Sequence, residues 1–133
     1  MDERLVDFLT RNHHAVMTTI KPDGAPHVAM VGIGLVDGRL WSSGTQTRRR
    51  TKHLRRDPRS TLCVLERANP YSWLAIESEV AILEGEEAPR QNLALYRVIR
   101  GEGPEDEEEY LSAMVRERRL IFEFRIKRTY GSL

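Results

Sequence analysis

The strand-forming parts of the chain are short segments, rich in apolar and β-branched residues, that are separated by turn residues. This pattern predicts strands over Val16–Ile20, Pro26–Val36, Arg39–Ser43, Ser60–Glu66, Trp73–Leu83 and Leu120–Lys127. The Lys-Pro-Asp-Gly sequence of residues 21–24 and the Asp37-Gly38 pair predict tight turns, so the first strands form a meander. Closely spaced strands of this kind favour a small antiparallel barrel of about six strands.

Helical spacing of apolar residues appears outside these segments. Residues 4–12 place Leu5, Phe8 and Leu9 on one face, and we expect this helix to cover an end of the barrel. Residues 87–100 predict a second helix, which Gly101 closes. The acidic run of residues 105–109 predicts the first turn of a third helix, where negative charge suits the helix dipole, rather than a metal site.

Composition limits the class of protein. The 133 residues carry a formal net charge of +1 and are 40% hydrophobic, which fits one domain over residues 1–133 and excludes a histone-like role. No apolar run approaches the ~20 residues that cross a bilayer, and the acidic start lacks the pattern of a signal peptide. We therefore expect a cytoplasmic protein with no membrane partner. Cys63 is the single cysteine and lies in an apolar run, so we expect a buried inert thiol and no disulfide or zinc site.

The stretch "RRRTKHLRRDPR", residues 48–59, concentrates seven Lys and Arg residues in a chain that is otherwise nearly balanced. Thr47 is a plausible N-cap for a helix that reaches Arg56 and ends at Asp57-Pro58. Arg48, Arg49 and Arg50 would then lie in the first turn, where the helix dipole opposes positive charge. A bound anion would remove this conflict, because it accepts the free N–H groups and the guanidinium groups together. The segment therefore predicts a phosphate site.

Two other interpretations of the basic stretch remain open at this point. It could be a solvated face balanced by the acids of residues 105–109, or it could contact nucleic acid through its arginines. Base stacking requires exposed aromatic side chains, and residues 48–59 contain none. A phosphate-bearing small molecule is therefore favoured over a nucleic acid.

Four segments together resemble a known family: "MTTIKPDGAPHVAMVG", "RRRTKHLRRDPRSTLCV", "YSWLAIESEVAIL" and the terminal "RIKRTYG". They are similar to the split β-barrel flavin and deazaflavin oxidoreductases related to pyridoxamine 5′-phosphate oxidase, in particular the group that uses coenzyme F420. The resemblance extends from about Phe8 to Gly131. It implies a mainly β fold with α-helices, a split β-barrel, and a homodimer in which the cofactor lies in a groove between two barrels.

The resemblance also implies site residues. Those expected to bind the cofactor are Pro26, Val28, Ala29, Met30, Ser42, Ser43, Gly44, Arg48, Arg50 and His53. Tyr71 and Trp73 match aromatic residues at the edge of the groove, where the substrate binds. The family often has Lys at the position of Arg50 and Asn at that of His53. His27 is our candidate catalytic residue, because an imidazole titrates near neutral pH and can polarise the ring or the substrate.

Motifs for other kinds of catalysis are missing: there is no catalytic triad, no helical pair of metal-binding histidines and no GxSxG. This fits a cofactor that itself carries the hydride. The sequence thus predicts an F420H2-dependent reductase that acts on a small conjugated molecule. F420 is favoured over FMN because seven basic residues suit its anionic lactyl-oligoglutamate tail. The alternatives are an FMN-binding oxidoreductase, a non-catalytic flavin- or tetrapyrrole-binding protein and an RNA-binding barrel.

Overall fold

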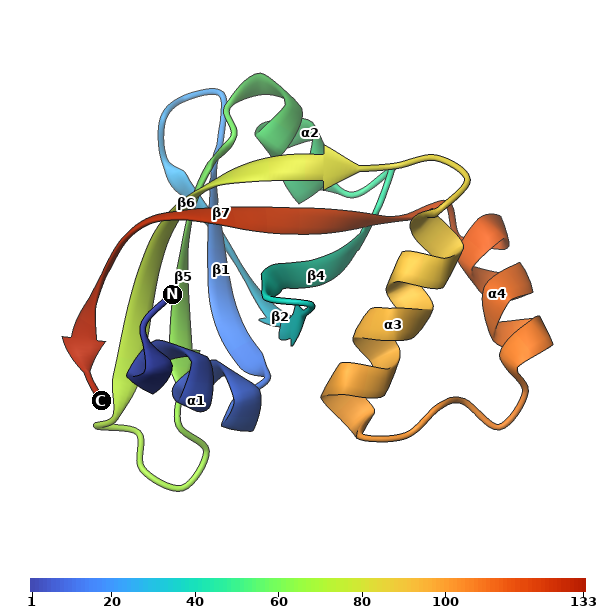
Figure 1. The fold of residues 1–133 in the computed structure, drawn as a ribbon. Coiled ribbons are helices and arrows are strands. Elements are labelled where there is room, and N and C mark those ends of the chain that lie inside the picture. The colour runs from blue at the N-terminus through green and yellow to red at the C-terminus, as the bar shows by residue number, and fades with distance from the viewer.

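Seven strands form one curled antiparallel sheet in the computed structural model, which describes residues 1–133 (Figure 1). Their spatial order is β2-β1-β5-β6-β7-β4-β3, so β2 and β3 are the two edges. The strands are β1 (His14–Ile20), β2 (Pro26–Gly32), β3 (Gly34–Val36), β4 (Arg39–Thr45), β5 (Arg59–Leu65), β6 (Trp73–Leu83) and β7 (Arg119–Ser132). The predicted class, mainly β with an antiparallel sheet and short flanking helices, is confirmed.

Four helices surround the sheet, and each has a local reason to start or stop. They are α1 (Glu3–Arg11), α2 (Arg49–Arg56), α3 (Ala88–Arg100) and α4 (Glu107–Arg116). Asp2 and Asp106 cap the N-termini of α1 and α4 with their carboxylates, and Gly101 closes α3 in the left-handed conformation at φ 78°. None of the helices has both the length and the apolar character needed to span a membrane.

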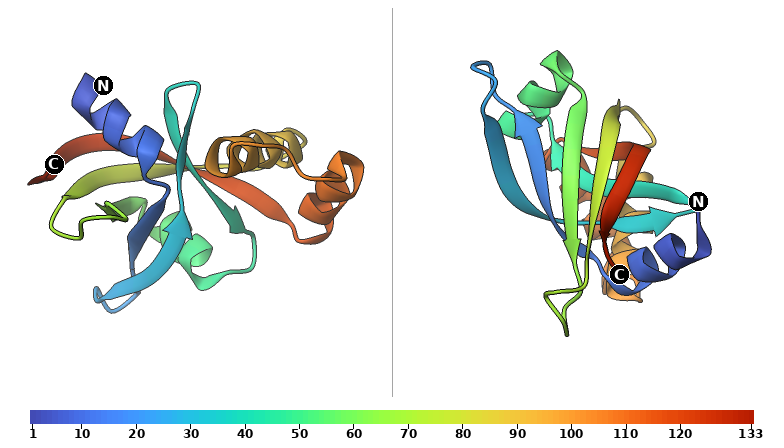
Figure 2. Two further views of the ribbon diagram at one scale, coloured as in Figure 1. Left: turned by 90° about the horizontal axis from the view of Figure 1, so that it is seen from below. Right: turned by 90° about the vertical axis from the view of Figure 1, so that its left-hand side faces the viewer.

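The two ends of the strands carry different elements. Figure 2 shows α2 at one end, and α1 together with the 66–72 loop at the other, while α3 and α4 lie beside the sheet. α1 buries Leu5, Phe8 and Leu9 against the main core, in agreement with the predicted covering helix. That core contains 17 buried residues on the inner face of the sheet, and a smaller cluster of four lies under α3.

The predicted strand Pro26–Val36 is wrong in one respect, because the chain breaks it into β2 and β3. The two pieces lie at opposite edges of the sheet, and at the break the Ile33 N–H donates to the His13 carbonyl. Packing against α3 fixes the break, since a Cβ on Gly34 would lie 2.9 Å from Val98 Cγ1. The curl of the sheet then brings β2 back toward β4, where the Ser42 hydroxyl donates to the Gly32 carbonyl at 2.7 Å.

The outer face of β2, β1, β5, β6 and β7 leaves apolar side chains in contact with solvent. Val28, Met30, Leu65 and Tyr130 are all exposed. Cys63 lies on the same face, opposite Val16, and is only partly buried, so the expectation of a buried thiol is wrong. The reason is register: Leu62 and Val64 point inward, and the residue between them must point outward. A large apolar sheet face therefore has no covering element within the chain.

Gly44 is the position where we expect one added methyl group to strain the barrel. A Cβ there would lie 2.5 Å from two ring atoms of Phe122, which is fully buried and cannot move freely. Gly44→Ala should lower the free energy of unfolding by about 1–3 kcal/mol in urea denaturation. In the control Gly32→Ala, the nearest atoms are Ile99 Cδ1 at 3.4 Å and the His13 carbonyl oxygen at 3.8 Å, so stability should change by less than about 0.5 kcal/mol. Equal stability of the two variants would contradict this packing argument.

Candidate functional site

The basic stretch forms α2, but its N-terminus differs from the prediction. Arg48 is the N-cap residue and no side chain caps the helix, so the predicted N-cap role of Thr47 is wrong. The Thr47 hydroxyl instead lies 3.5 Å from that of Thr45. The helix is anchored by Thr51, whose fully buried hydroxyl donates to the Thr45 carbonyl at 2.6 Å. The first turn thus keeps backbone N–H donors that no side chain accepts.

Part of the basic stretch is neutralised within the chain. Arg55 donates twice to Glu84, at 2.7 and 3.1 Å, and Arg59 donates twice to Asp57, at 2.8 and 3.1 Å. The hydrogen bonds from Arg59 lower the pKa of Asp57 to about 2. Arg56 donates to the carbonyl of Ile20 at the end of β1. These contacts hold the C-terminal half of α2 against the barrel.

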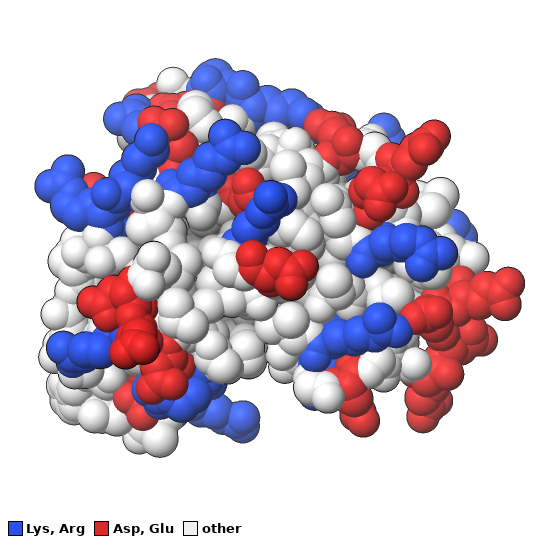
Figure 3. All heavy atoms as spheres, viewed as in Figure 1, with Lys and Arg blue, Asp and Glu red and all other residues white.

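The other four basic residues of the stretch, Arg48, Arg49, Arg50 and Lys52, form no ion pair. They all lie at the N-terminal half of α2. The predicted balance with residues 105–109 does not occur, because Glu107 pairs with Arg97 and Glu109 with Arg116. Figure 3 shows these acids gathered over α4, to the right of the view, away from the basic side chains along the top.

Arg50 is the most enclosed of the four. Burial, together with the charges of Arg48 and Arg119, lowers its pKa, and its Nε atom is buried without a hydrogen-bond partner. One other buried side-chain atom in the chain is also without a partner, Nδ1 of His27. Both belong to residues that the sequence assigned to the site, and an unpaired buried polar group costs free energy. Such atoms are suited to a ligand that supplies the missing partner.

His27 on β2 faces His53 on α2. Their ring centroids are 5.2 Å apart at an interplanar angle of 70°, and Nδ1 of His53 lies 2.9 Å from the hydroxyl of Thr19 on β1. Burial, and then the charges of His27, Arg56, Lys21 and Arg49, lower the pKa of His53. His53 is therefore a neutral imidazole at pH 7.

The alternation of β2 divides its predicted site residues between two faces. Pro26, Val28 and Met30 point outward, whereas His27 and Ala29 point to the inner side, toward α2 and the core. The structure thus brings His27 and His53 together, places Arg50 one turn before His53 on α2, and leaves the apolar row on the opposite face of β2.

The three predicted residues of β4 already have partners within the protein. Ser42 donates to a backbone carbonyl, Ser43 donates to Asn92 Oδ1 at 2.5 Å, and Gly44 lies under the ring of Phe122. Their side chains shape the strand that leads into α2. A cofactor contact at these positions remains a prediction.

Tyr71 and Trp73 lie at the other end of the strands. Trp73 starts β6 opposite the end of β5, and its ring packs edge-on against Tyr130 at 6.1 Å, on the outer face. Tyr71 is 84% exposed in the preceding loop. Within one chain, the loop before β6 lies at the opposite end of the strands from α2 (Figure 2).

Sequence reasoning missed Thr19, Thr51 and Lys21. Thr19 and Thr51 could have been noticed, because each is a hydroxyl residue in a position that the pattern marks as buried, and buried hydroxyls need partners. Lys21 lies in the β1–β2 turn, and its charge lowers the pKa of His53. No local pattern in the sequence indicates that this turn lies close to His53.

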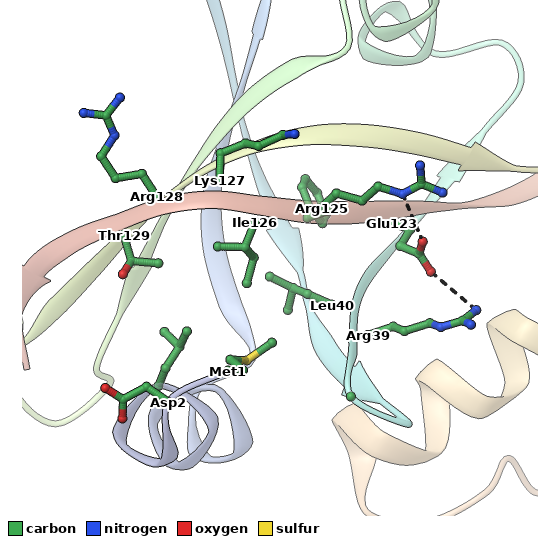
Figure 4. A pocket seen from close by; sticks show the side chains of 13 residues that line it. Met1, Asp2, Arg39, Leu40, Glu123, Arg125, Ile126, Lys127, Arg128 and Thr129 are labelled. Atoms are coloured by element: carbon green, nitrogen blue, oxygen red, sulfur yellow. Dashed lines mark ion pairs between the residues drawn. The ribbon is translucent and has the colours of Figure 1, made fainter.

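A hollow of about 630 Å³ lies elsewhere, between α1 and β7 (Figure 4). Its apolar floor includes Leu5, Leu40 and Ile126, but it contains none of the predicted site residues. The basic side chains at its rim are already paired, as with Arg39 and Arg125, which both contact Glu123. The unpaired charge and the unpartnered buried atoms are at α2, and we therefore place the candidate site there.

Comparison with known proteins finds a matching family and a similar protein. The family model of pyridoxamine 5′-phosphate oxidase matches residues 1–132. The F420H2-dependent biliverdin reductase of Mycobacterium tuberculosis is 27% identical over 125 residues, which cover 94% of this chain and 83% of that protein.

Solved structures share the fold. A conserved hypothetical protein from Mycobacterium tuberculosis superposes with a TM-score of 0.83 at 22% identity, over 97% of this chain and 82% of the other. An F420 reductase gives 0.74 at 22% identity, over 98% of both chains. A candidate pyridoxamine 5′-phosphate oxidase from Listeria innocua superposes with a TM-score of 0.70 at 14% identity, over 96% of this chain and 94% of the other. The predicted split β-barrel is confirmed.

The bond between Thr51 and Thr45 should be measurable as stability of the whole domain. Thr51→Val removes the buried donor at nearly constant volume and should cost about 1–3 kcal/mol in chemical denaturation. Thr51→Ser keeps the hydroxyl and should lose clearly less. If Val and Ser variants were equally stable, the hydroxyl would not be what anchors α2.

Proposed function

The chain belongs to the pyridoxamine 5′-phosphate oxidase family, and we propose that within it this protein is an F420H2-dependent reductase acting on a small conjugated organic substrate. The observation that carries the proposal is the pair of unpartnered buried atoms, Arg50 Nε in the uncapped first turn of α2 and His27 Nδ1 on β2, whose ring faces His53 of the same helix. The similarity to an F420H2-dependent biliverdin reductase supports the choice of cofactor.

The first turn of α2 fits a phosphate group. Free backbone N–H groups and the positive end of the helix dipole favour an anion there. Arg48 and Arg50 add guanidinium groups, which bind phosphate oxygens through paired hydrogen bonds. A phosphate would relieve the repulsion among these cations and would give Arg50 the acceptor that it lacks in the protein.

The number of basic side chains without an ion-pair partner favours F420 over FMN. FMN carries one phosphate, whereas F420 continues beyond its phosphate into a tail of carboxylates. Arg49 and Lys52 form no ion pair in the protein and remain free to meet further negative charge. One phosphate would leave them without a role.

When bound, the reduced deazaflavin would supply the hydride. The protein would then have to hold the ring, present one of its faces and limit access of water. The exposed apolar row of Val28 and Met30 on β2 offers a flat surface for the ring. His27, at the same strand, would donate or accept a hydrogen bond near the polar edge of the ring or substrate.

A second copy of the chain would complete the groove. The outer sheet face exposes Val28, Met30, Leu65 and Tyr130, an apolar surface typical of an interface. Tyr71 and Trp73 lie far from α2 in one chain, so they can border the same groove only if they come from a partner copy. We therefore propose a homodimer in which both chains contribute to each site.

The cofactor is tested by titrating the purified protein with F420 and with FMN at physiological salt and following fluorescence. We expect tighter binding of F420 and, with F420H2, turnover of conjugated acceptors such as tetrapyrroles, quinones or enones. Arg50→Ala should weaken F420 binding about 10- to 100-fold, the loss expected for one charge-assisted hydrogen bond in a partly buried site. Arg59→Ala, in the same stretch but paired with Asp57, should change it less than about 3-fold.

Other outcomes would separate the alternatives. Preference for FMN would move the chain to an FMN-dependent activity, and F420 binding without turnover of any acceptor would indicate a binding protein. Equal effects of Arg50→Ala and Arg59→Ala would contradict a phosphate site at the first turn of α2.

The dimer is tested by sedimentation of the wild type and of Leu65→Glu. Placing a charge on the apolar outer face should dissociate the dimer and abolish F420 binding, because burying an unpaired carboxylate is costly. Val115→Glu is the matched control, since Val115 is exposed on α4, away from that face, and should leave both properties unchanged. A wild-type monomer that binds F420 fully would contradict the shared site.

A further inference from the structure

Thr19 has a single polar partner in the fold. Its side chain is 1% exposed, and its hydroxyl contacts only Nδ1 of His53, at 2.9 Å. A buried hydroxyl has one hydrogen to donate, and leaving it undonated is unfavourable. The Thr19 hydroxyl therefore donates to Nδ1. Because a neutral imidazole carries one proton, this bond places the proton of His53 on Nε2.

Adding a second proton to the His53 ring is unfavourable, because the groups whose charges act on it are basic. Arg49 and Arg56 lie on its own helix, Lys21 is in the β1–β2 turn, and His27 faces it from β2. The groups that act on His53 are all basic, and no ion pair to a carboxylate offsets them. Burial acts in the same direction, and the pKa of His53 is lowered. The ring is therefore held as one neutral tautomer.

Nε2 of His53 is the ring nitrogen that has no partner in the protein. It makes no hydrogen bond within the protein, and it is not among the enclosed unpartnered atoms, which are His27 Nδ1 and Arg50 Nε. Arg50 precedes His53 by three residues, so both side chains lie on the same face of α2. The Nε2–H of His53 is therefore left to donate to a ligand on the face of α2 that also carries Arg50.

We propose that Thr19 is a positioning residue that fixes His53 as the neutral Nε2–H tautomer, so that His53 donates a hydrogen bond to the anionic group bound at the start of α2. This rests on the proposed phosphate site. The arrangement adds a donor without adding another charge to a crowded cluster of cations. It also lowers the pH at which His53 would become charged, because burial and the neighbouring basic groups lower its pKa.

Nitrogen NMR of histidine-labelled protein without cofactor tests the tautomer directly, with His53→Asn used to assign the signals. The wild type should show His53 with its proton on Nε2. Thr19→Val removes the donor at nearly constant shape and should produce a mixture of the two tautomers. Thr19→Ser retains the hydroxyl and should restore the wild-type spectrum. A His53 proton on Nδ1 in the wild type, or an unchanged spectrum in Thr19→Val, would overturn the proposal.

Ligand binding tests the second half. Thr19→Val should weaken F420 binding about 3- to 10-fold at pH 7.5, and Thr19→Ser should bind within about 2-fold of the wild type. Inorganic phosphate should shift the Nε2 signal of His53 in the wild type. If F420 fails to bind but phosphate shifts this signal, the proposed function fails and the role of Thr19 stands. If neither ligand affects the signal, donation to an anion is excluded.

Discussion

Positive charge at the N-terminus of α2 is the constraint around which the rest of the site is arranged. Arg48, Arg49 and Arg50 lie where a helix favours anions, and no acidic side chain compensates for them. The fold holds this unfavourable turn in place through the buried bond between Thr51 and Thr45. Sequences break a local rule of this kind where function requires it, because the cost must be recovered by another interaction.

The ion pairs of other basic residues in the chain contrast with the lack of ion pairs at the start of α2. Arg55 and Arg59 have carboxylate partners at hydrogen-bonding distance, and the acids of α4 pair with arginines of α3 and α4. On α2 itself, Arg55 pairs with Glu84, whereas none of the basic residues at its N-terminal half has a carboxylate partner. Exposed pairs contribute little to stability, so their effect is mainly to direct which charges remain available to a ligand.

Much of the architecture could be predicted from local patterns, whereas the details of the site could not. Alternation and turn residues predicted most strands, and the basic stretch predicted α2. The break at Gly34 depends on contacts with α3, which is some 60 residues away in the chain, and no local pattern encodes it. The N-cap prediction for Thr47 failed because Thr51 anchors the helix from within instead.

His53 shows why residue type alone does not define a role. The resemblance matched it to a position that contacts the cofactor, and a solvent-exposed histidine there would be a titratable cation. The fold instead encloses it between Thr19 and His27 among basic side chains, which removes the charge and keeps the hydrogen-bond donor. In the role that we propose for it, His53 would resemble the neutral amide of the Asn that the resemblance places at this position. A site already rich in arginines gains more from a directed neutral donor than from one more positive charge, since each added cation must be desolvated beside the others.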